Sequence, residues 1–216
     1  MDFETRAIHA GQEPDPATGS VVVPIYQTST YAQDAVGQNK GYDYSRVANP
    51  TRTALQINLA SLESAEHGVA FASGMAAVTT VMHLVHPSER VVSVNDVYGG
   101  VYRLFSQVYQ PKGYDIEFLS AEEINTNLAE HLDERTRIVW LETPTNPLLN
   151  VIEIEAAAKT AHEVGAMVVV DDRGAALLPP EVPRGNSRPV RLLARAARAE
   201  DARGAALVRS PAATGA

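Results

Sequence analysis

The sequence contains no cysteine among its 216 residues, which excludes a disulfide framework and a thiolate metal site. It has no apolar run approaching the roughly 18 residues that a membrane-spanning helix needs. Its first residues have neither a basic region nor an apolar core, so we expect no secretory signal peptide. The 6 histidines show no metal-ligand spacing, so we expect no metal site. A cytoplasmic protein is therefore the expectation.

Lysine is also missing from the last part of the chain, where the balance of charge reverses. Residues 1–172 contain 10 Lys and Arg against 23 Asp and Glu, whereas residues 173–216 contain 8 Arg against 3 acidic residues. The acidic bulk argues against nucleic acid as a partner, although a basic tail can bind it. Residues 173–216 also contain 12 Ala and no Ile, Phe, Tyr, Trp, Met or His. Nothing in them resembles a further strand of a sheet.

Short apolar runs and segments of helical periodicity alternate between residues 49 and 172. We expect strands at residues 69–72, 91–94, 114–118, 138–141 and 167–170. A helix is expected to begin at Asn49 and Pro50, a capping residue followed by one suited to the first helical turn. Further helices are expected at residues 74–85, 98–109, 124–132 and 153–164. This order predicts an α/β fold with a mainly parallel sheet and helices on both faces.

Three regions follow from this pattern. Residues 1–48 form an N-terminal arm with few regular elements, and its tyrosines favour packing on a neighbouring subunit over a disordered terminus. Residues 49–172 form a truncated large domain. We interpret residues 173–216 as an irregular, aberrant Arg-, Ala- and Pro-rich tail that is either disordered or the product of a reading-frame shift. A genuine basic tail is the alternative.

Two of the predicted strand-to-helix turns contain residues suited to a ligand. Ser73 and Gly74 begin a helix, where free N–H groups and a partial positive charge favour a phosphate. A structural glycine is the alternative, and neither a P-loop nor a Gly-x-Gly-x-x-Gly fingerprint is present. Tyr98 precedes Gly99 and Gly100. Its ring either stacks on a planar ligand or packs within the turn.

Two further turns carry polar side chains. Glu142 and Asn146 follow the strand at residues 138–141 in a loop that two prolines hold extended, either at a ligand-binding edge or in an ordinary turn. Asp171 ends the last predicted strand, where a carboxylate either caps a helix or pairs with a protonated ring nitrogen of a cofactor. Ligands of open α/β sheets bind beyond the carboxyl ends of the strands, so these turns are candidate site positions.

Seven short motifs are distributed along residues 3–172. They are Thr-Arg-Ala-Ile-His-Ala-Gly at 5–11, Pro-Ile-Tyr-Gln-Thr-Ser-Thr-Tyr at 24–31, Tyr-Ser-Arg at 44–46, Asn-Pro-Thr at 49–51, Ala-Ser-Gly-Met-Ala-Ala at 72–77, Tyr-Gly-Gly at 98–100 and Glu-Thr-Pro-Thr-Asn-Pro at 142–147. With them the sequence resembles the Cys/Met-metabolism family of pyridoxal-phosphate (PLP) enzymes, the cystathionine γ-synthase, γ-lyase and β-lyase group. The resemblance implies the large domain of an aspartate-aminotransferase-like, PLP-dependent transferase.

The resemblance also implies PLP as the cofactor. The residues that it assigns to the cofactor are Tyr44, Arg46, Ser73, Gly74, Met75, Tyr98, Asn146 and Asp171. Backbone N–H groups of Gly74 and Met75 would bind the phosphate, and Tyr98 would stack on the pyridine ring. Asn146 would lie near the 3-oxygen, and Asp171 would pair with the ring nitrogen. The arm would send its Tyr-Ser-Arg motif to the phosphate of a neighbouring subunit, which implies a homotetramer built from two dimers.

The activity implied is that of a trans-sulfuration enzyme acting on small amino acids, most like cystathionine γ-synthase, which joins an O-acylhomoserine and cysteine into cystathionine. A cystathionine γ- or β-lyase, an O-acetylhomoserine sulfhydrylase, and a non-catalytic fragment that lends residues to a neighbouring site are alternatives. The family's Schiff-base lysine follows a Ser-x-Thr motif beyond the aspartate, but this chain has no lysine after Lys159. We therefore assign no catalytic residue and expect the chain alone to be inactive.

Overall fold

The computed structural model describes residues 1–172, 190–193 and 204–207, the last two segments by their backbone only. The chain forms two compact units, residues 1–70 and 71–216. The tail that we expected at residues 173–216 lies outside the described residues apart from those two short segments.

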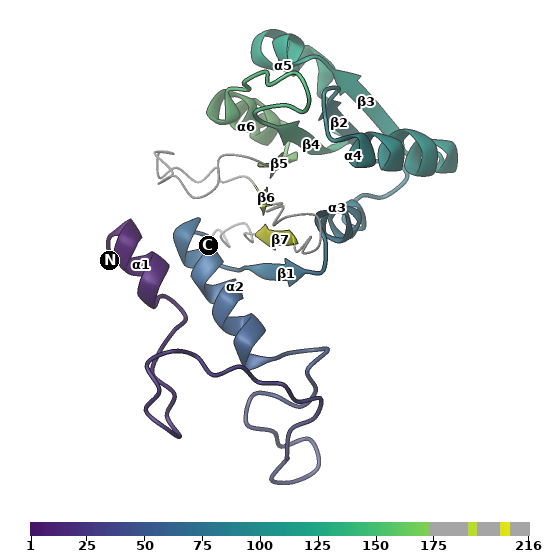
Figure 1. The fold of residues 1–216 in the computed structure, drawn as a ribbon. Helices are drawn as coiled ribbons and strands as arrows, with labels where there is room; N and C mark the ends of the chain where they lie inside the picture. The colour runs from purple at the N-terminus through teal and green to yellow at the C-terminus, as the bar shows by residue number, and fades with distance from the viewer. Residues whose placement is uncertain (173–189, 194–203, 208–216) are drawn as a thin grey trace, which may run out of the picture. The chain divides into compact units, whose positions relative to one another are not determined.

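The first unit contains two helices, α1 (Phe3–His9) and α2 (Pro50–Leu62) (Figure 1). Helix α2 begins as predicted, because the Asn49 side chain accepts a hydrogen bond from Thr51 N at 2.9 Å. Helix α1 was not among the predicted elements, since it is short and its cap makes no side-chain hydrogen bond. Tertiary contacts hold it instead: Asn58 Nδ2 donates to the carbonyl oxygens of Arg6 and Ala10 at 3.1 and 3.0 Å.

The second unit alternates strands and helices, as the sequence predicted. After β1 (Val69–Phe71), which lies at the boundary between the units, the elements are α3 (Gly74–Met82), β2 (Arg90–Val94), α4 (Gly99–Arg103), β3 (Asp115–Leu119), α5 (Ala121–Asn127), β4 (Thr136–Glu142), α6 (Ile154–Glu163) and β5 (Met167–Asp171). Two of the expected helices are irregular. A π-helix, η1 (Leu104–Tyr109), and a 3-10 turn, η2 (Gln110–Lys112), continue α4, and a 3-10 turn, η3 (Leu128–His131), continues α5.

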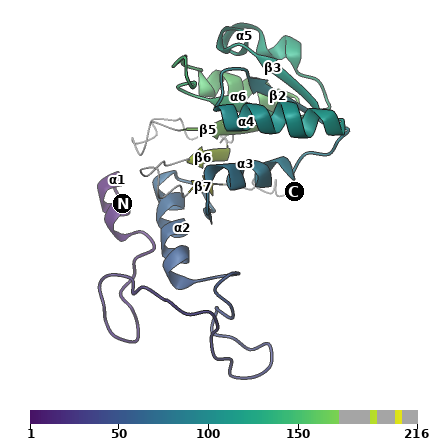
Figure 2. The same ribbon diagram turned by 45° about the vertical axis from the view of Figure 1, so that its right-hand side comes forward.

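Within the second unit the strands lie in the order β7-β6-β5-β4-β2-β3. Strand β2 pairs in parallel with both β3 and β4, and β4 pairs in parallel with β5. The crossover through α4 runs in one direction along the sheet, whereas those through α5 and α6 run in the other. Right-handed crossovers then place α4 on one face and α5 with α6 on the opposite face. Consistently, α3 contacts α4 and α5 contacts α6 (Figure 2).

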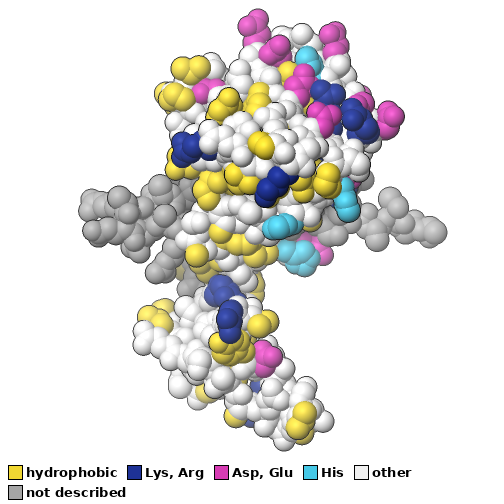
Figure 3. Space-filling view, turned by 90° about the vertical axis from the view of Figure 1, so that its right-hand side faces the viewer, with side chains coloured by type: hydrophobic (Ala, Val, Ile, Leu, Met, Phe, Trp, Pro, Cys, Tyr) yellow, Lys and Arg dark blue, Asp and Glu magenta, His cyan; other side chains and the backbone are white. Residues whose placement is uncertain are grey.

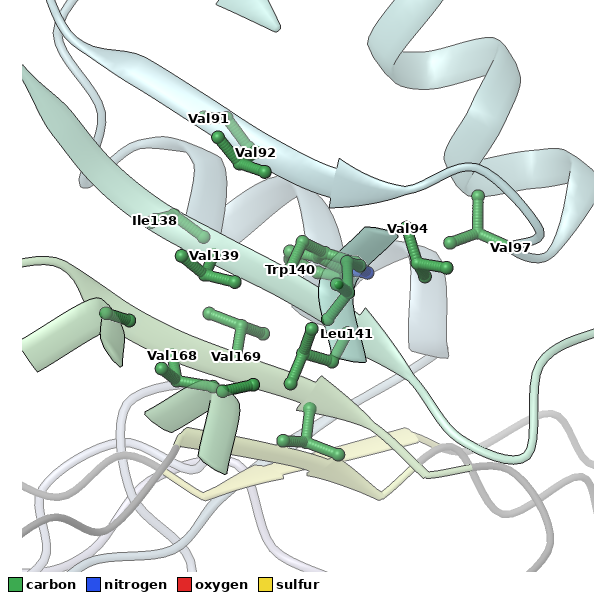
Figure 4. Close-up of a cluster of buried hydrophobic side chains, with 14 of the residues drawn as sticks. Val91, Val92, Val94, Val97, Ile138, Val139, Trp140, Leu141, Val168 and Val169 are labelled. Atoms are coloured by element: carbon green, nitrogen blue, oxygen red, sulfur yellow. The ribbon is translucent and has the colours of Figure 1, made fainter. Parts of the chain in front are cut away.

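The core lies along the three central strands. Val91, Val92 and Val94 of β2 are fully buried, as are all residues of β4 from Ile138 to Leu141 (Figure 4). Continuous burial along a strand means that both faces of the sheet are covered, which explains why these strands lack polar alternation. The Trp140 ring meets Phe105 edge-on, with 5.3 Å between centroids and 88° between planes. The parallel pairing of the strands and their burial on both faces confirm the α/β fold class that the sequence predicted.

A network of charged side chains occupies the edge where the strands begin. Arg90 at the start of β2 binds the Glu117 carboxylate of β3, and Glu117 Oε1 lies 3.0 Å from His131 Nδ1. Arg135 Nη2 donates to Asp133 Oδ2 at 2.9 Å, and this hydrogen bond lowers the pKa of Asp133. Figure 3 shows basic and acidic side chains lying side by side over part of the second unit. This network therefore lies at the edge opposite the carboxyl ends of the strands.

Two strands beyond residue 172 were not predicted. Strand β6 (Val190–Leu193) pairs in parallel with β5, and β7 (Gly204–Leu207) pairs antiparallel with β6. Both are only four residues long. Their pairing uses backbone groups that any sequence supplies, so the composition of the tail gave no signal for them.

Throughout the described parts of the chain, every helix is too short or too polar to cross a bilayer.

Candidate cofactor site

The candidate residues of the second unit lie at the N-terminus of α3, which follows β1, and at the carboxyl ends of β2, β4 and β5. Strand β2 is followed by a helix on one face of the sheet and β4 by a helix on the other, so the loops after these two neighbouring strands diverge. Such a reversal is where open α/β sheets bind their ligands. The turn that carries Tyr98 follows β2, and the loop that carries Asn146 follows β4.

The N-terminus of α3 carries the predicted phosphate cradle. Ser73 is its cap, and Ser73 Oγ accepts a hydrogen bond from Ala76 N at 3.2 Å. Gly74 and Met75 occupy the first two helical positions, whose N–H groups have no partner inside a helix. The helix therefore begins with two backbone donors and a partial positive charge, as anion binding requires.

Gly100 fits between the Tyr98 ring and the Met75 side chain. A Cβ built on Gly100 would lie 2.5 Å from Tyr98 Cε1 and 3.0 Å from Met75 Sδ, closer than a real Cβ tolerates. The ring of Tyr98 is therefore folded back over the glycine, next to the start of α3. Gly99 makes no comparable contact, since its Cβ would meet only the flexible end of Arg103 at 3.3 Å.

Two buried carboxylates end the neighbouring strands β4 and β5. Glu142 and Asp171 are register partners, with exposed fractions of 0% and 2%. Because register partners in a parallel pair point to the same face, the two carboxylates lie on one side of the sheet. Glu142 Oε2 accepts a hydrogen bond from Tyr98 N at 2.8 Å, so β4 holds the turn that follows β2.

The loop after β4 is tied back to the end of β2. Asp96 Oδ2 accepts hydrogen bonds from Thr145 Oγ1 and from Leu148 N, the latter at 3.0 Å. The peptide bonds Thr143–Pro144 and Asn146–Pro147 are both cis. The two hydrogen bonds to Asp96 hold the loop that carries Asn146 against the turn after β2. Sequence reasoning missed Asp96, because no spacing or motif connects it to a threonine 49 residues away.

Tyr44 and Arg46 lie in the first unit and contact each other. Arg46 Nη2 donates to Tyr44 Oη at 2.9 Å, and the guanidinium carbon lies 4.9 Å from the centre of the Tyr44 ring. A β-bridge between Thr30 and Tyr44 fixes the backbone of this segment. The pair thus presents an exposed cation supported by an aromatic ring, an arrangement suited to a phosphate.

These observations fit PLP in three respects. Two backbone donors at a helix N-terminus match the phosphate, a glycine leaves room for an aromatic ring, and a buried carboxylate ends a strand on the same sheet edge. Contacts join Met75, Gly100, Tyr98 and Glu142, and the pairing of β4 with β5 places Asp171 beside Glu142. The described residues hold no cluster of three or more His, Cys, Asp or Glu placed to bind a metal.

The comparisons with known proteins agree with this chemistry. The family model described as "Cys/Met metabolism PLP-dependent enzyme" matches residues 4–177. A protein of Herpetosiphon aurantiacus named "Probable cystathionine gamma-synthase" is 51% identical over 170 residues, which cover 79% of this chain and 53% of that protein. The cystathionine beta-lyase of Coxiella burnetii is 45% identical over 171 residues, covering 79% of this chain and 44% of that enzyme.

A solved structure has the same fold. The crystal structure of cystathionine gamma-lyase from Lactobacillus plantarum complexed with L-serine aligns with a TM-score of 0.88 and 35% identity, covering 98% of this chain and 56% of that one. The chain therefore spans about half the length of the curated relatives and the solved structure that it matches.

Proposed function

Because the chain belongs to the Cys/Met metabolism PLP-dependent enzyme family, we propose that the carboxyl edge of its sheet binds PLP and that it corresponds to the N-terminal part of a trans-sulfuration enzyme. The observation that carries this proposal is the series of contacts from the start of α3, through Gly100 and Tyr98, to the buried carboxylate of Glu142, whose register partner is the buried Asp171. Phosphate donors, a stacking ring and an acid are groups that a PLP site supplies besides its Schiff-base lysine.

Each proposed residue has a distinct role toward the cofactor. The N–H groups of Gly74 and Met75 bind the phosphate, and the ring of Tyr98 stacks on the pyridine. Asp171 holds the proton on the pyridine nitrogen, because a buried carboxylate favours a cationic partner. The bound cofactor supplies an electron sink for the substrate's α-carbon. Asn146 donates a hydrogen bond near the 3-oxygen.

The proposed reaction for the complete enzyme is the joining of an O-acylhomoserine and cysteine into cystathionine. The similarity to a probable cystathionine gamma-synthase supports this choice. Cystathionine β-lyase and γ-lyase activities are the alternatives that other relatives suggest, and an O-acetylhomoserine sulfhydrylase is another. For the 216-residue chain itself we propose no turnover, since no lysine follows Lys159 to hold the cofactor covalently.

The first expected result is that the purified chain binds PLP reversibly and turns over no substrate. Trp140 is the single tryptophan, so quenching of its fluorescence by bound PLP gives the dissociation constant. Turnover is assayed with O-acylhomoserine plus cysteine and, separately, with cystathionine. A titration without quenching would disprove the PLP site, whereas product above the cofactor-only blank would disprove the proposed inactivity.

A second candidate function is a non-catalytic subunit that completes the site of a full-length partner. The preformed pair of Tyr44 and Arg46 favours it, because a supported cation can be lent to a phosphate on another chain. In this proposal residues 1–48 pack on the neighbouring subunit and assembly follows the expected dimer of dimers. Co-expression with a full-length relative tests this role. A mixed oligomer whose activity is lost when this chain carries Arg46→Ala supports the role, whereas separate elution of the two chains rejects it.

Gly100→Ala is expected to weaken PLP binding about tenfold, the loss of one aromatic stack. The new methyl group would lie 2.5 Å from Tyr98 Cε1, so the ring must leave its position. Fluorescence titration of Trp140 measures the affinity, and Gly99→Ala is the matched control because its methyl meets only the end of Arg103. Equal affinities for the two variants would contradict the placement of Tyr98.

A further inference from the structure

Asp96 is a buried carboxylate that no motif singled out and that connects two parts of the candidate site. It lies in the turn after β2, two residues before Tyr98. Its Oδ2 accepts two hydrogen bonds from the loop after β4, one from Thr145 Oγ1 and one from Leu148 N at 3.0 Å. Hydrogen bonds to a charged acceptor are about twice as strong as neutral ones.

Thr145 makes several of the hydrogen bonds that hold this loop together. Its side chain is fully buried, and its Oγ1, while donating to Asp96, accepts from Asn150 N at 2.8 Å. Its backbone N–H donates to Asn150 O at 2.9 Å, and its carbonyl oxygen accepts from Leu149 N at 3.0 Å. The loop that carries Asn146 is therefore closed on Thr145, and Thr145 is anchored on Asp96.

Apolar packing does not hold this loop. Leu148 and Leu149 are 70% and 71% exposed, so their side chains contribute little burial. Leu149 also has φ of 60°, a left-handed conformation that is strained for a leucine. The polar contacts to Thr145 and Asp96 must offset that strain, and the loop's shape therefore depends on them.

We propose that Asp96 is a positioning residue for the cofactor: it fixes the Asn146 loop relative to the Tyr98 turn. The inference rests on the proposed PLP site. Glu142 makes the reciprocal connection, because it ends β4 and accepts from Tyr98 N, whereas Asp96 follows β2 and accepts from the loop after β4. Two carboxylates thus fix the same pair of turns: Glu142 at the end of β4 and Asp96 just after β2. They keep a constant distance between Tyr98 and Asn146, the two side chains proposed to contact the cofactor ring.

The test compares the wild-type chain with Asp96→Ala, Asp96→Asn and Thr145→Val. The ligand is pyridoxine 5′-phosphate, which has the ring and phosphate of PLP but no aldehyde to react with surface lysines. Quenching of Trp140 fluorescence gives the dissociation constant, and circular dichroism in the ligand's absorption band reports how its ring is held. Asp96→Ala and Thr145→Val are expected to bind about tenfold more weakly and to show reduced dichroism at saturation. Asp96→Asn is expected to lose less affinity than Asp96→Ala, because its amide oxygen still accepts the two hydrogen bonds, although without the charge that strengthens them.

A control variant separates positioning from general destabilisation. Ser120→Ala removes the capping box of α5, in which Ser120 Oγ accepts from Glu123 N at 3.1 Å, within the same unit. It is expected to lower the urea midpoint without changing the affinity. An equal loss of affinity in Ser120→Ala would overturn the proposal.

The outcomes also separate this inference from the proposed function. If the wild-type chain does not bind the ligand, the PLP site and the inference are both rejected. If the wild type binds and both Asp96→Ala and Thr145→Val keep its affinity and dichroism, only the inference is rejected. If Asp96→Ala does not fold, Thr145→Val decides, because it removes one hydroxyl and leaves the carboxylate in place.

Discussion

Trp140→Ala is expected to destabilise the folded chain by about 4 kcal/mol, the range found for large aromatic side chains removed from a core. Trp140 is fully buried in the central strand β4, and its ring contacts Phe105 edge-on at 5.3 Å between centroids. Alanine at this position leaves a cavity between the sheet and the π-helix that contains Phe105. Urea denaturation followed by far-ultraviolet circular dichroism measures the loss, since the fluorescent residue is itself removed.

Trp140→Phe is the matched variant and should cost much less, about 1 kcal/mol. It keeps an aromatic ring against Phe105 and removes the indole N–H, for which Trp140 has no hydrogen-bond partner among the described residues. A buried unsatisfied donor costs about 1–3 kcal/mol, so its removal offsets part of the lost volume. Equal destabilisation by alanine and phenylalanine would mean that volume is not what Trp140 contributes.

Asp171→Ala is expected to weaken PLP binding about 30-fold, equivalent to about 2 kcal/mol for one charge-assisted hydrogen bond. Asp171 is 2% exposed, so water does not screen its interaction with a pyridinium proton. The absorbance of bound PLP should also shift toward that of the unprotonated ring. Titration of Trp140 fluorescence and visible spectra of the saturated chain measure both effects.

Asp171→Asn and Asp133→Asn are the controls for this result. Asparagine at 171 keeps the shape but removes the charge, so it should weaken binding nearly as much as alanine. Asp133 lies at the opposite edge of the sheet in the charged network with Arg135, and its replacement should leave the affinity unchanged. Wild-type affinity in Asp171→Asn would show that charge on this residue does not contribute to binding.

The sequence predicted most of the fold because its elements have local signals. Strand β4 appears as an uninterrupted apolar run at residues 138–141, which a parallel sheet covered on both faces requires. Helix α2 begins at Pro50 because the Asn49 side chain caps it, and α3 begins at Gly74 because Ser73 caps it in the same way. In each case the residues that determine the boundary are neighbours in sequence. Family membership, which the motifs indicated, is confirmed by the match over residues 4–177.

The contacts that organise the candidate site had no such local signal. Asp96 meets Thr145 across 49 residues, and Glu142 meets Tyr98 N across 44 residues. Both attachments exist only because β2 and β4 are neighbours in the sheet, which no spacing in the sequence reveals. Helix α1 likewise depends on Asn58 of another helix. Roles of the cofactor residues stay predictions until the binding experiments are done.

The place of β2 between β3 and β4 sets an order of assembly during synthesis. As the chain leaves the ribosome, β2 can pair with β3 while β4 is still being made, because β3 comes next in sequence. Strand β4 must then add to the remaining edge of β2, and β5 to the far side of β4. The edge that carries Tyr98, Glu142 and Asp171 is completed only when β5 has paired with β4. Until β4 has paired with both of them, the valine-rich strands β2 and β5 have backbone edges that other nascent chains can bind. The steps that build the proposed cofactor edge are therefore also those most exposed to aggregation.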